Sequence, residues 1–266
     1  ALKLLTVVAA PDRSLEPIAA LLADRDLRER ARYALEEIGS PPASAALVVR
    51  LQQDAEADPD FACALLNSLA RVCNRESLPT VAGLLQSGNP KVRAAAVRAL
   101  AWTGDPAYLE PARAVLASAD DATRSDAGDA LLRLLDALAR DDAHRAAVAV
   151  SQDLLKTGQG TVRDGALAGL GRHAAAASVA PILAAARDRS VSTRRAALSA
   201  LRALSGTEST TALVAQYDAQ PPDLQLALLP VLAARADAQV VPLLAAAAAW
   251  PDVAAATAAL RALGAT

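Results

Sequence analysis

The sequence of 266 residues contains no methionine and few aromatic residues: two tryptophans, three tyrosines and one phenylalanine. These aromatic residues are scattered along the chain, whereas proteins that wedge or stack nucleotide bases need them at the interface. The formal net charge is −2. A chain with this balance has no global field that attracts nucleic acid or anionic lipid. We therefore expect neither nucleic acid nor a membrane as a partner.

Long apolar runs and targeting segments are missing as well. The longest apolar run, Leu243 to Trp250, is shorter than the stretch of about 18 residues that indicates a transmembrane helix. No signal peptide is visible, and the two cysteines, which we expect to be reduced thiols, favour a cytoplasmic protein. The chain begins at Ala1 without a methionine. We therefore expect the natural N-terminus to lie outside this sequence.

Side chains for metal, redox or nucleophilic chemistry are scarce. Cys63 and Cys73 fall on one predicted helix about 15 Å apart by helical rise, too far for a disulfide, and we expect two buried, reduced thiols. His144 and His173 are the only histidines, and both fall at predicted helix ends. Zinc spacing and nucleophile motifs are absent. The sequence therefore predicts no catalytic residue, no metal site and no cofactor, and hence a protein that is not an enzyme.

What the sequence does have is a leucine that returns at intervals of about 31 residues, the period of stacked helical repeats. Alanine and leucine, the strongest helix formers, dominate the composition, which predicts an all-helical chain. The recurring leucines are Leu5, Leu35, Leu69, Leu100, Leu131, Leu170, Leu201, Leu232 and Leu260. We call them anchor leucines and expect them in the core.

The repeat around Leu100 shows the pattern most clearly. Asn89 is a good N-cap, and Pro90 suits the first position of a helix. The turn that begins at Gly104 ends this first helix. A second helix follows, with a proline in its first turn at Pro111, where the N–H groups have no partner within the helix.

Other positions recur in register with the anchor leucines. Four residues before the anchor stands a small residue, at Ala31, Ala96, Ala127, Ala166, Ala197 and Ala256, which permits close helix packing. Seven residues before it stands an arginine, at Arg28, Arg93, Arg124, Arg163 and Arg194. Eleven residues before it stands a capping residue, at Asp24, Asp58, Asn89, Asp120 and Ser190. We call the five arginines the arginine ladder.

This combination resembles HEAT repeats, in particular the short repeats of bilin-lyase-like proteins, along essentially the whole chain. The resemblance implies an all-α fold, a right-handed α-solenoid of about eight helix-turn-helix repeats, with first helices on the convex side and second helices on the concave side. It also implies that each ladder arginine pairs with an Asp or Asn at the start of a neighbouring first helix, which is a structural role. Neither histidine is followed by Glu. The His-Glu motif of the di-iron hydroxylases built from such repeats is therefore missing.

We predict a single repeat array over residues 1–266, with two longer intervals, from Leu35 to Leu69 and from Leu131 to Leu170. In the second, the first helix is expected to extend through Leu138 to Asp141 and Asp142, and the next helix to run from about Ala143 to Lys156. Both ends lack a polar capping repeat, which solenoids need for solubility. We therefore expect a segment of a longer protein, monomeric or weakly self-associating through uncapped ends. The glycines around Leu170 are interpreted as helix punctuation.

The outward positions of the second helices are mostly small or apolar, and an apolar groove on a soluble protein indicates a partner site. The candidate positions on this concave face are Val48, Val49, Gln52, Gln86, Glu110, Arg113, Ala114, Leu183, Ala184, Arg187, Val214 and Ala215. They predict a non-enzymatic scaffold that binds a protein or peptide. The alternatives are a regulatory or bilin-lyase-like module attached to an enzyme, and nucleic-acid binding.

Overall fold

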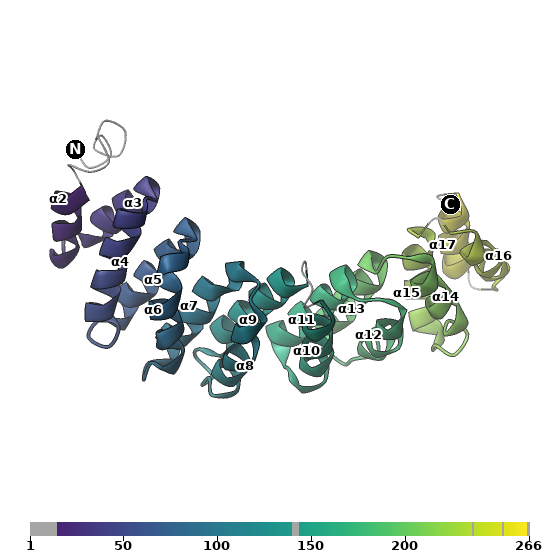
Figure 1. Ribbon diagram of the computed structural model, residues 1–266. Helices are drawn as coiled ribbons and strands as arrows, with labels where there is room; N and C mark the ends of the chain where they lie inside the picture. The colour runs from purple at the N-terminus through teal and green to yellow at the C-terminus, as the bar shows by residue number, and fades with distance from the viewer. Residues whose placement is uncertain (1–14, 140–143, 236, 252, 265–266) are drawn as a thin grey trace. The chain divides into compact units, whose positions relative to one another are not determined.

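The computed structural model describes residues 15–139, 144–235, 237–251 and 253–264. These residues form α-helices joined by turns and short 3₁₀ helices, and they contain no strand. The chain divides into two compact units, residues 1–141 and 142–266, which we call unit 1 and unit 2. Each described part is a stack of antiparallel helix pairs (Figure 1). The predicted all-α solenoid fold is confirmed.

Unit 1 has two layers of helices (Figure 1). Successive first helices pack on one another, and each also packs on a second helix. The first helices are α3 (Arg28–Ile38), α5 (Pro59–Val72), α7 (Pro90–Leu100) and α9 (Arg124–Leu138). The second helices are α2 (Leu15–Ala20), α4 (Pro41–Asp54), α6 (Leu78–Gly83) and α8 (Leu109–Ala117). Short 3₁₀ helices extend or precede them: η1 (Leu21–Ala23), η2 (Arg75–Ser77), η3 (Leu84–Gln86), η4 (Ala101–Thr103) and η5 (Pro106–Tyr108).

Unit 2 repeats the same arrangement. Its first helices are α11 (Gly160–His173), α13 (Val191–Ala203), α15 (Pro222–Ala233) and α17 (Val253–Leu263). Its second helices are α10 (His144–Thr157), α12 (Val179–Ala185), α14 (Thr207–Ala215) and α16 (Val241–Ala248), with η6 (Ala176–Ser178) and η7 (Ala238–Val240) before two of them. Helix α9 ends at Leu138, and α10 runs from His144 to Thr157, close to the range predicted for it. The predicted extension to Asp141 and Asp142 lies outside the described residues.

Local side-chain chemistry explains where the first helices begin. The Asp58 carboxylate accepts a hydrogen bond from the Phe61 N–H at 3.2 Å, and the Asn89 side chain accepts one from the Lys91 N–H at 3.0 Å. Each satisfies one of the N–H groups that a helix start leaves without a partner. Gly104 ends the helical stretch after Leu100 in the left-handed conformation that glycine adopts without strain.

The anchor leucines from Leu35 to Leu232 are buried, and all are at most 2% exposed. The small residues four positions earlier, from Ala31 to Ala197, are also buried. The last repeat departs from this register: Leu260 is 60% exposed, and Ala259 is buried in its place. The prediction for Leu260 is therefore wrong, because α17 turns a different face to α15 and α16, the helices that cover it. Leu5 lies outside the described residues.

The glycines around Leu170 do not end a helix. Both Gly169 and Gly171 lie inside α11, and Gly171 is buried. A Cβ atom on Gly171 would lie 2.7 Å from the Cα atom of Ala200 in α13. The interpretation as punctuation is wrong at Gly171, where the absence of a side chain lets two successive first helices approach closely.

The cysteines also differ from the prediction. Helix α5 ends at Val72, and Cys73 follows it as a left-handed C-cap with φ of 55°. Cys73 is exposed and Cys63 is half-buried, so neither thiol is fully buried, although both are free. The sequence lacks a glycine at this helix end, and a cysteine therefore takes the conformation that glycine usually adopts.

Candidate functional site

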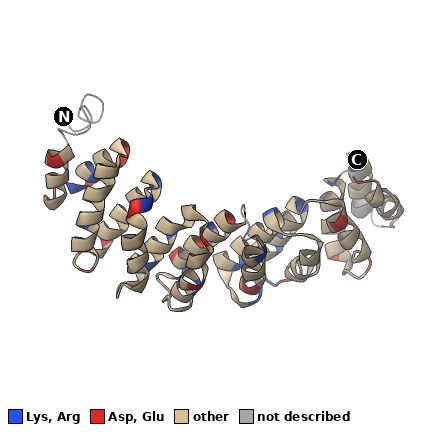
Figure 2. Ribbon diagram, viewed as in Figure 1, with Lys and Arg blue, Asp and Glu red and all other residues tan. Residues whose placement is uncertain are grey.

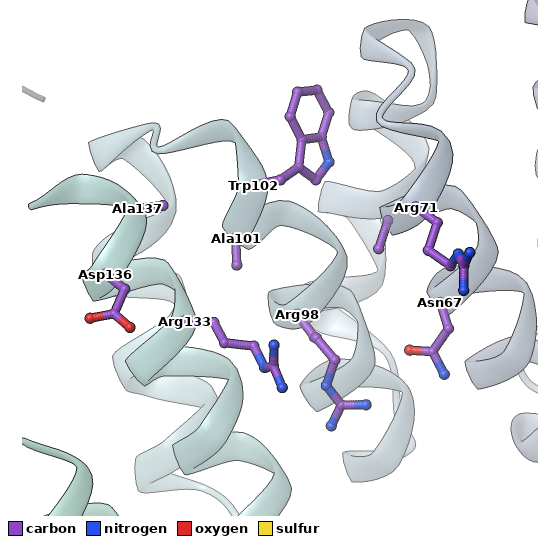
Figure 3. Close-up of a pocket in the computed structure, with 9 residues that line it drawn as sticks. Asn67, Arg71, Arg98, Ala101, Trp102, Arg133, Asp136 and Ala137 are labelled. Atoms are coloured by element: carbon purple, nitrogen blue, oxygen red, sulfur yellow. The ribbon is translucent and has the colours of Figure 1, made fainter. Parts of the chain in front are cut away.

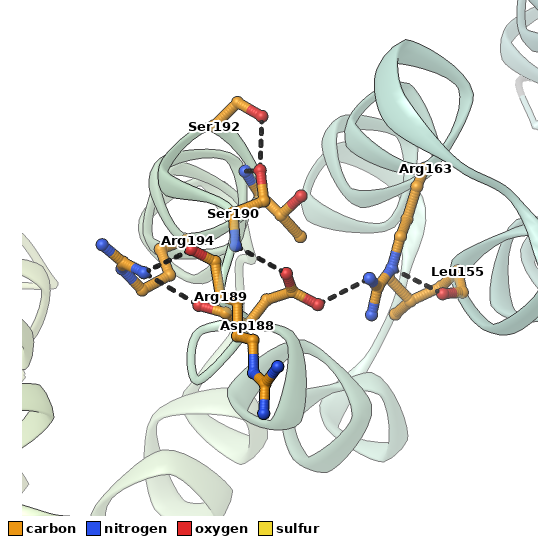
Figure 4. Close-up of polar contacts among 8 residues, drawn as sticks. Leu155, Arg163, Asp188, Arg189, Ser190, Ser192 and Arg194 are labelled. Carbon is orange, nitrogen blue, oxygen red and sulfur yellow. Dashed lines mark hydrogen bonds and ion pairs between the residues drawn. The ribbon is translucent and has the colours of Figure 1, made fainter.

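Two ladder arginines contact an aspartate of the following repeat. Arg28 Nη1 lies 2.6 Å from Asp58 Oδ2, and the Arg28 guanidinium lies 4.3 Å from the centre of the Phe61 ring. Arg163 Nη1 lies 2.6 Å from Asp188 Oδ2, and its Nε donates to the Leu155 carbonyl at 3.0 Å (Figure 4). These contacts join successive repeats as the resemblance implied.

The other three ladder arginines make a different contact. Arg93 Nη1 donates to the Ser87 carbonyl at 2.8 Å, and Arg124 Nη2 donates to the Ala119 carbonyl at 2.9 Å. Arg194 Nη1 donates to the carbonyls of Asp188 and Arg189, at 2.9 and 3.0 Å (Figure 4). Each arginine thus bonds carbonyls in the turn that precedes its own helix. The expected partner, an Asp or Asn of a neighbouring helix, is not the contact made at these three positions.

The second helices place most of the predicted concave residues at the surface. Leu183 is the exception: it is 2% exposed, and its side chain belongs to the core of unit 2. Its inclusion as a site residue is wrong, because α12 buries both Ile182 and Leu183. The exposed positions are Val49, Gln52, Gln86, Glu110, Ala114, Ala184, Arg187 and Ala215, and the half-buried ones are Val48, Arg113 and Val214. We call this set without Leu183 the second-helix surface.

Two polar members of the second-helix surface join neighbouring repeats. The Gln52 side chain donates to Thr80 Oγ1 at 3.4 Å, and Arg187 donates to Gln220 Oε1 at 2.7 and 3.1 Å. These side chains therefore stabilise the stack in addition to facing solvent. The candidate binding area in each unit consists chiefly of its exposed small and apolar positions.

A hollow of about 300 Å³ interrupts the second-helix surface of unit 1. It lies between α2 with η1 and helix α4, and Ala19, Leu22, Ala46 and Val49 give it an apolar lining. Val49 is 55% exposed although it is a large apolar residue. Arg50 stands at the same hollow, held by two hydrogen bonds to the buried Asp54 carboxylate at 2.5 and 2.7 Å.

A larger hollow, of about 520 Å³, lies on the first helices of unit 1 (Figure 3). Its lining comes from α5, α7 with η4, and α9. The lining residues are Asn67, Ala70, Arg71, Arg98, Ala101, Trp102, Arg133, Asp136 and Ala137. We call it the arginine–tryptophan hollow.

The charges of the arginine–tryptophan hollow are unequally neutralised. Arg71 Nε lies 2.7 Å from Glu36 Oε1, and that carboxylate is buried, with 6% of its side chain exposed. Arg98 has Asp126 at 4.0 Å, at the limit of an ion pair. Arg133 is exposed and makes no ion pair or hydrogen bond within the part of the chain that the structure describes. Elsewhere in each unit, acidic and basic residues are interspersed (Figure 2).

None of the residues in this hollow was a candidate in the sequence analysis. A signal was present, however, because Arg71, Arg98, Trp102 and Arg133 each stand two positions before or after an anchor leucine. Two residues along a helix correspond to a rotation of about 200°, so these positions face away from the buried leucine. The structure places Trp102 half-buried at the edge of the hollow.

The described residues contain neither a cluster that could hold a metal ion nor a helix that could span a membrane. Among them, no group of three or more His, Cys, Asp or Glu side chains is placed to hold a metal ion. No described helix has the length and apolar character needed to cross a lipid bilayer.

Comparison with known proteins supports the repeat assignment. Residues 52–132, which run from the end of α4 to α9, match the family model described as HEAT repeats. This part of the chain is therefore similar to HEAT repeats. The match does not distinguish the bilin-lyase type. No curated protein matches the chain.

Among solved structures, human deoxyhypusine hydroxylase in complex with glycerol matches with a TM-score of 0.44 and 20% sequence identity, over 96% of each chain. The sequence-based prediction that the protein is not an enzyme is contradicted by this likeness to an enzyme and is wrong as drawn. Helical repeats and an absence of familiar motifs are not sufficient grounds to exclude catalysis. At this identity and TM-score, no substrate, metal or activity is carried over to the present chain.

Proposed function

We propose that this protein is a helical-repeat scaffold that binds a partner protein along its second-helix surface. The observation that carries the proposal is the apolar hollow beside Val49, in a unit that also contains the HEAT repeats at residues 52–132. Large exposed apolar side chains at a concave surface are typical of interaction sites.

The partner segment that suits this surface is an amphipathic helix. The exposed small residues Ala114 in unit 1 and Ala184 and Ala215 in unit 2 leave room for close approach of a partner's backbone. Helix-in-groove recognition needs that room together with apolar anchor points, and the hollow at Val49 supplies one. Arg50, fixed by Asp54 at its rim, is placed to meet an acidic residue beside the anchor.

The test combines capture and titration. Val49→Glu and Ala114→Glu place bulk and charge on the second-helix surface of unit 1, at exposed positions where stability should change by about 0.5 kcal/mol. Proteins that bind the wild type in a lysate are identified and purified, and their affinity for each variant is measured by calorimetry. We expect binding to weaken by about tenfold or more in both variants.

The matched control introduces glutamate on exposed first-helix positions, with Ala168→Glu in α11 and Ser199→Glu in α13. These controls should bind as the wild type does. Equal binding by the second-helix variants and the wild type would reject this surface as the binding site. Unfolding of Ala114→Glu, followed by circular dichroism, would contradict the exposure on which the proposal depends.

A further inference from the structure

We propose that the arginine–tryptophan hollow is a second binding site, which takes an acidic peptide segment of a partner protein. In this site Arg98 and Arg133 bind carboxylates of the segment, and Trp102 packs on an apolar residue next to them. The site lies on the first helices of unit 1, so it is separate from the second-helix surface.

The first argument is the arrangement of Arg98 and Arg133. They come from α7 and α9, which pack side by side, and Figure 3 shows their side chains extending in the same direction. Arg133 has no partner within the described residues, and Asp126 is 4.0 Å from Arg98, beyond hydrogen-bond distance. Two guanidinium groups with unused donors are suited to carboxylates, which they can bind through paired hydrogen bonds.

The second argument is that Arg71 is held in place before any ligand arrives. Its bond to the buried Glu36 uses Nε, and Glu36 is itself fixed by Ser68, which donates to Glu36 Oε2 at 2.7 Å. The side chain of Arg71 is nevertheless 70% exposed. Its terminal nitrogens are therefore presented at the rim with little further loss of side-chain entropy on binding.

The third argument is the apolar part of the hollow. Trp102 is half-buried, and the alanines Ala70, Ala101 and Ala137 complete the lining on three helices. Tryptophan and arginine are the residue types that most often dominate binding energy at protein interfaces. An apolar side chain of the peptide can cover the exposed part of the indole while its acidic neighbours reach the arginines.

The same lining favours a peptide over nucleic acid. Asp136 stands among the arginines, and Glu36 and Asp126 flank them, so the positive surface is interrupted. A polynucleotide needs a continuous basic track, and stacking proteins offer several aromatic residues to successive bases. A peptide carries its carboxylates separately, beside apolar side chains, and it therefore suits a hollow that has an interrupted positive surface and one tryptophan.

The experiment uses the whole chain and a random peptide library displayed on phage. The wild-type protein should enrich peptides in which Asp or Glu neighbours a large apolar residue, and the most enriched peptide is then synthesised and titrated by fluorescence anisotropy. We expect Arg133→Glu and Trp102→Ala each to weaken its binding by about tenfold to a hundredfold, as for the loss of a charged hydrogen bond or an anchor. Replacing the acidic residues of the peptide by Gln or Asn should weaken binding similarly.

The matched control is Arg75→Glu, an exposed arginine of the same unit that does not line the hollow. It should bind the peptide as the wild type does, and so should Ala114→Glu, which separates this site from the second-helix surface. Enrichment of no peptide, or of peptides without acidic residues, would overturn the proposal. So would a bound peptide that is insensitive to Arg133→Glu, or a labelled single-stranded oligonucleotide that binds more tightly than the peptide.

Discussion

The carboxylate of Asp58 accepts two hydrogen bonds, one on each oxygen. One comes from Arg28 of the preceding repeat, and the other comes from the N–H of Phe61 in the helix that Asp58 begins. The Oδ2 atom lies 2.6 Å from Arg28 Nη1, and Oδ1 accepts from Phe61 at 3.2 Å. One side chain therefore caps α5 and links two repeats. Asp188 also links two repeats through Arg163 at 2.6 Å, and it accepts a hydrogen bond at 2.8 Å from the N–H of Ser190, the N-cap residue of α13.

This arrangement predicts a pH dependence. The hydrogen bond from Arg28, followed by that from the Phe61 N–H, lowers the pKa of Asp58 below its usual value of 3.8. A lowered pKa in the folded state adds stability above the unfolded pKa, and this stability is lost as the pH falls through the folded value. Asp58→Asn keeps a capping oxygen but removes the charge. We expect it to unfold at a lower urea concentration than the wild type at neutral pH, with a difference that shrinks below about pH 4.

The measurement is a set of urea unfolding curves for both proteins from neutral to acidic pH. Asp60→Asn serves as the control, because Asp60 forms only an exposed ion pair with Lys91. A difference between Asp58→Asn and the wild type that stays constant across this pH range would show that the charge of Asp58 does not stabilise the fold.

Replacing an anchor leucine by alanine should lower the free energy of unfolding more where the leucine is more deeply buried. Leu100 is fully buried, and we expect Leu100→Ala to lower the free energy of unfolding by about 2–5 kcal/mol. Leu260 is 60% exposed, and Leu260→Ala should change it by about 0.5 kcal/mol or less. Urea unfolding of the two variants gives the comparison. Similar losses in both would mean that α17 buries Leu260 in solution.

Gly171 and Gly169 form a matched pair within α11. A Cβ at Gly171 would lie 2.7 Å from Ala200 Cα and 2.9 Å from its carbonyl oxygen, so Gly171→Ala must separate α11 from α13. We expect a loss of about 1–3 kcal/mol, as for other overpacked sites. At Gly169 the nearest atom is Ser151 Oγ at 3.7 Å, an ordinary contact.

Gly169→Ala should therefore be neutral or stabilising by up to about 1 kcal/mol, the difference in helix propensity between the two residues. Thermal unfolding monitored by circular dichroism distinguishes the pair. Equal stability of both alanine variants would argue against the close approach of the two helices.

The two thiols should react at different rates. Cys73 is exposed at the end of α5, whereas Cys63 is half-buried in the helix. Burial raises the pKa of both thiols, so alkylation of each should be slow at neutral pH and should accelerate as the pH rises. We expect iodoacetamide to modify Cys73 first, with Cys73→Ser removing the faster phase in mass spectra. Faster loss of the Cys63 thiol would contradict the described accessibility.

Much of the repeat register could be predicted from the sequence because it depends on local chemistry. Capping residues such as Asp58 and Asn89, and apolar spacing around Leu100, act within one helix and its turn. At Leu260 the same spacing failed, because the face a helix buries is decided by the neighbours it packs against. Likewise, no feature of the sequence indicated that Cys73 takes the left-handed position at the end of α5, which glycine usually occupies.

The sequence by itself determined the helical-repeat fold, since a periodic pattern of leucine, alanine and capping residues allows few other ways to bury its apolar face. Only the tertiary structure decided which side chains meet between repeats. It paired Arg28 and Arg163 with an aspartate of the next repeat but left Arg93, Arg124 and Arg194 on carbonyls of the turns before their own helices. It also put Leu183 in the core and brought Arg71, Arg98 and Arg133 to one hollow with Trp102. Contacts between repeats, such as that of Arg28 with Asp58, join residues 30 positions apart, and their geometry depends on how successive helices pack.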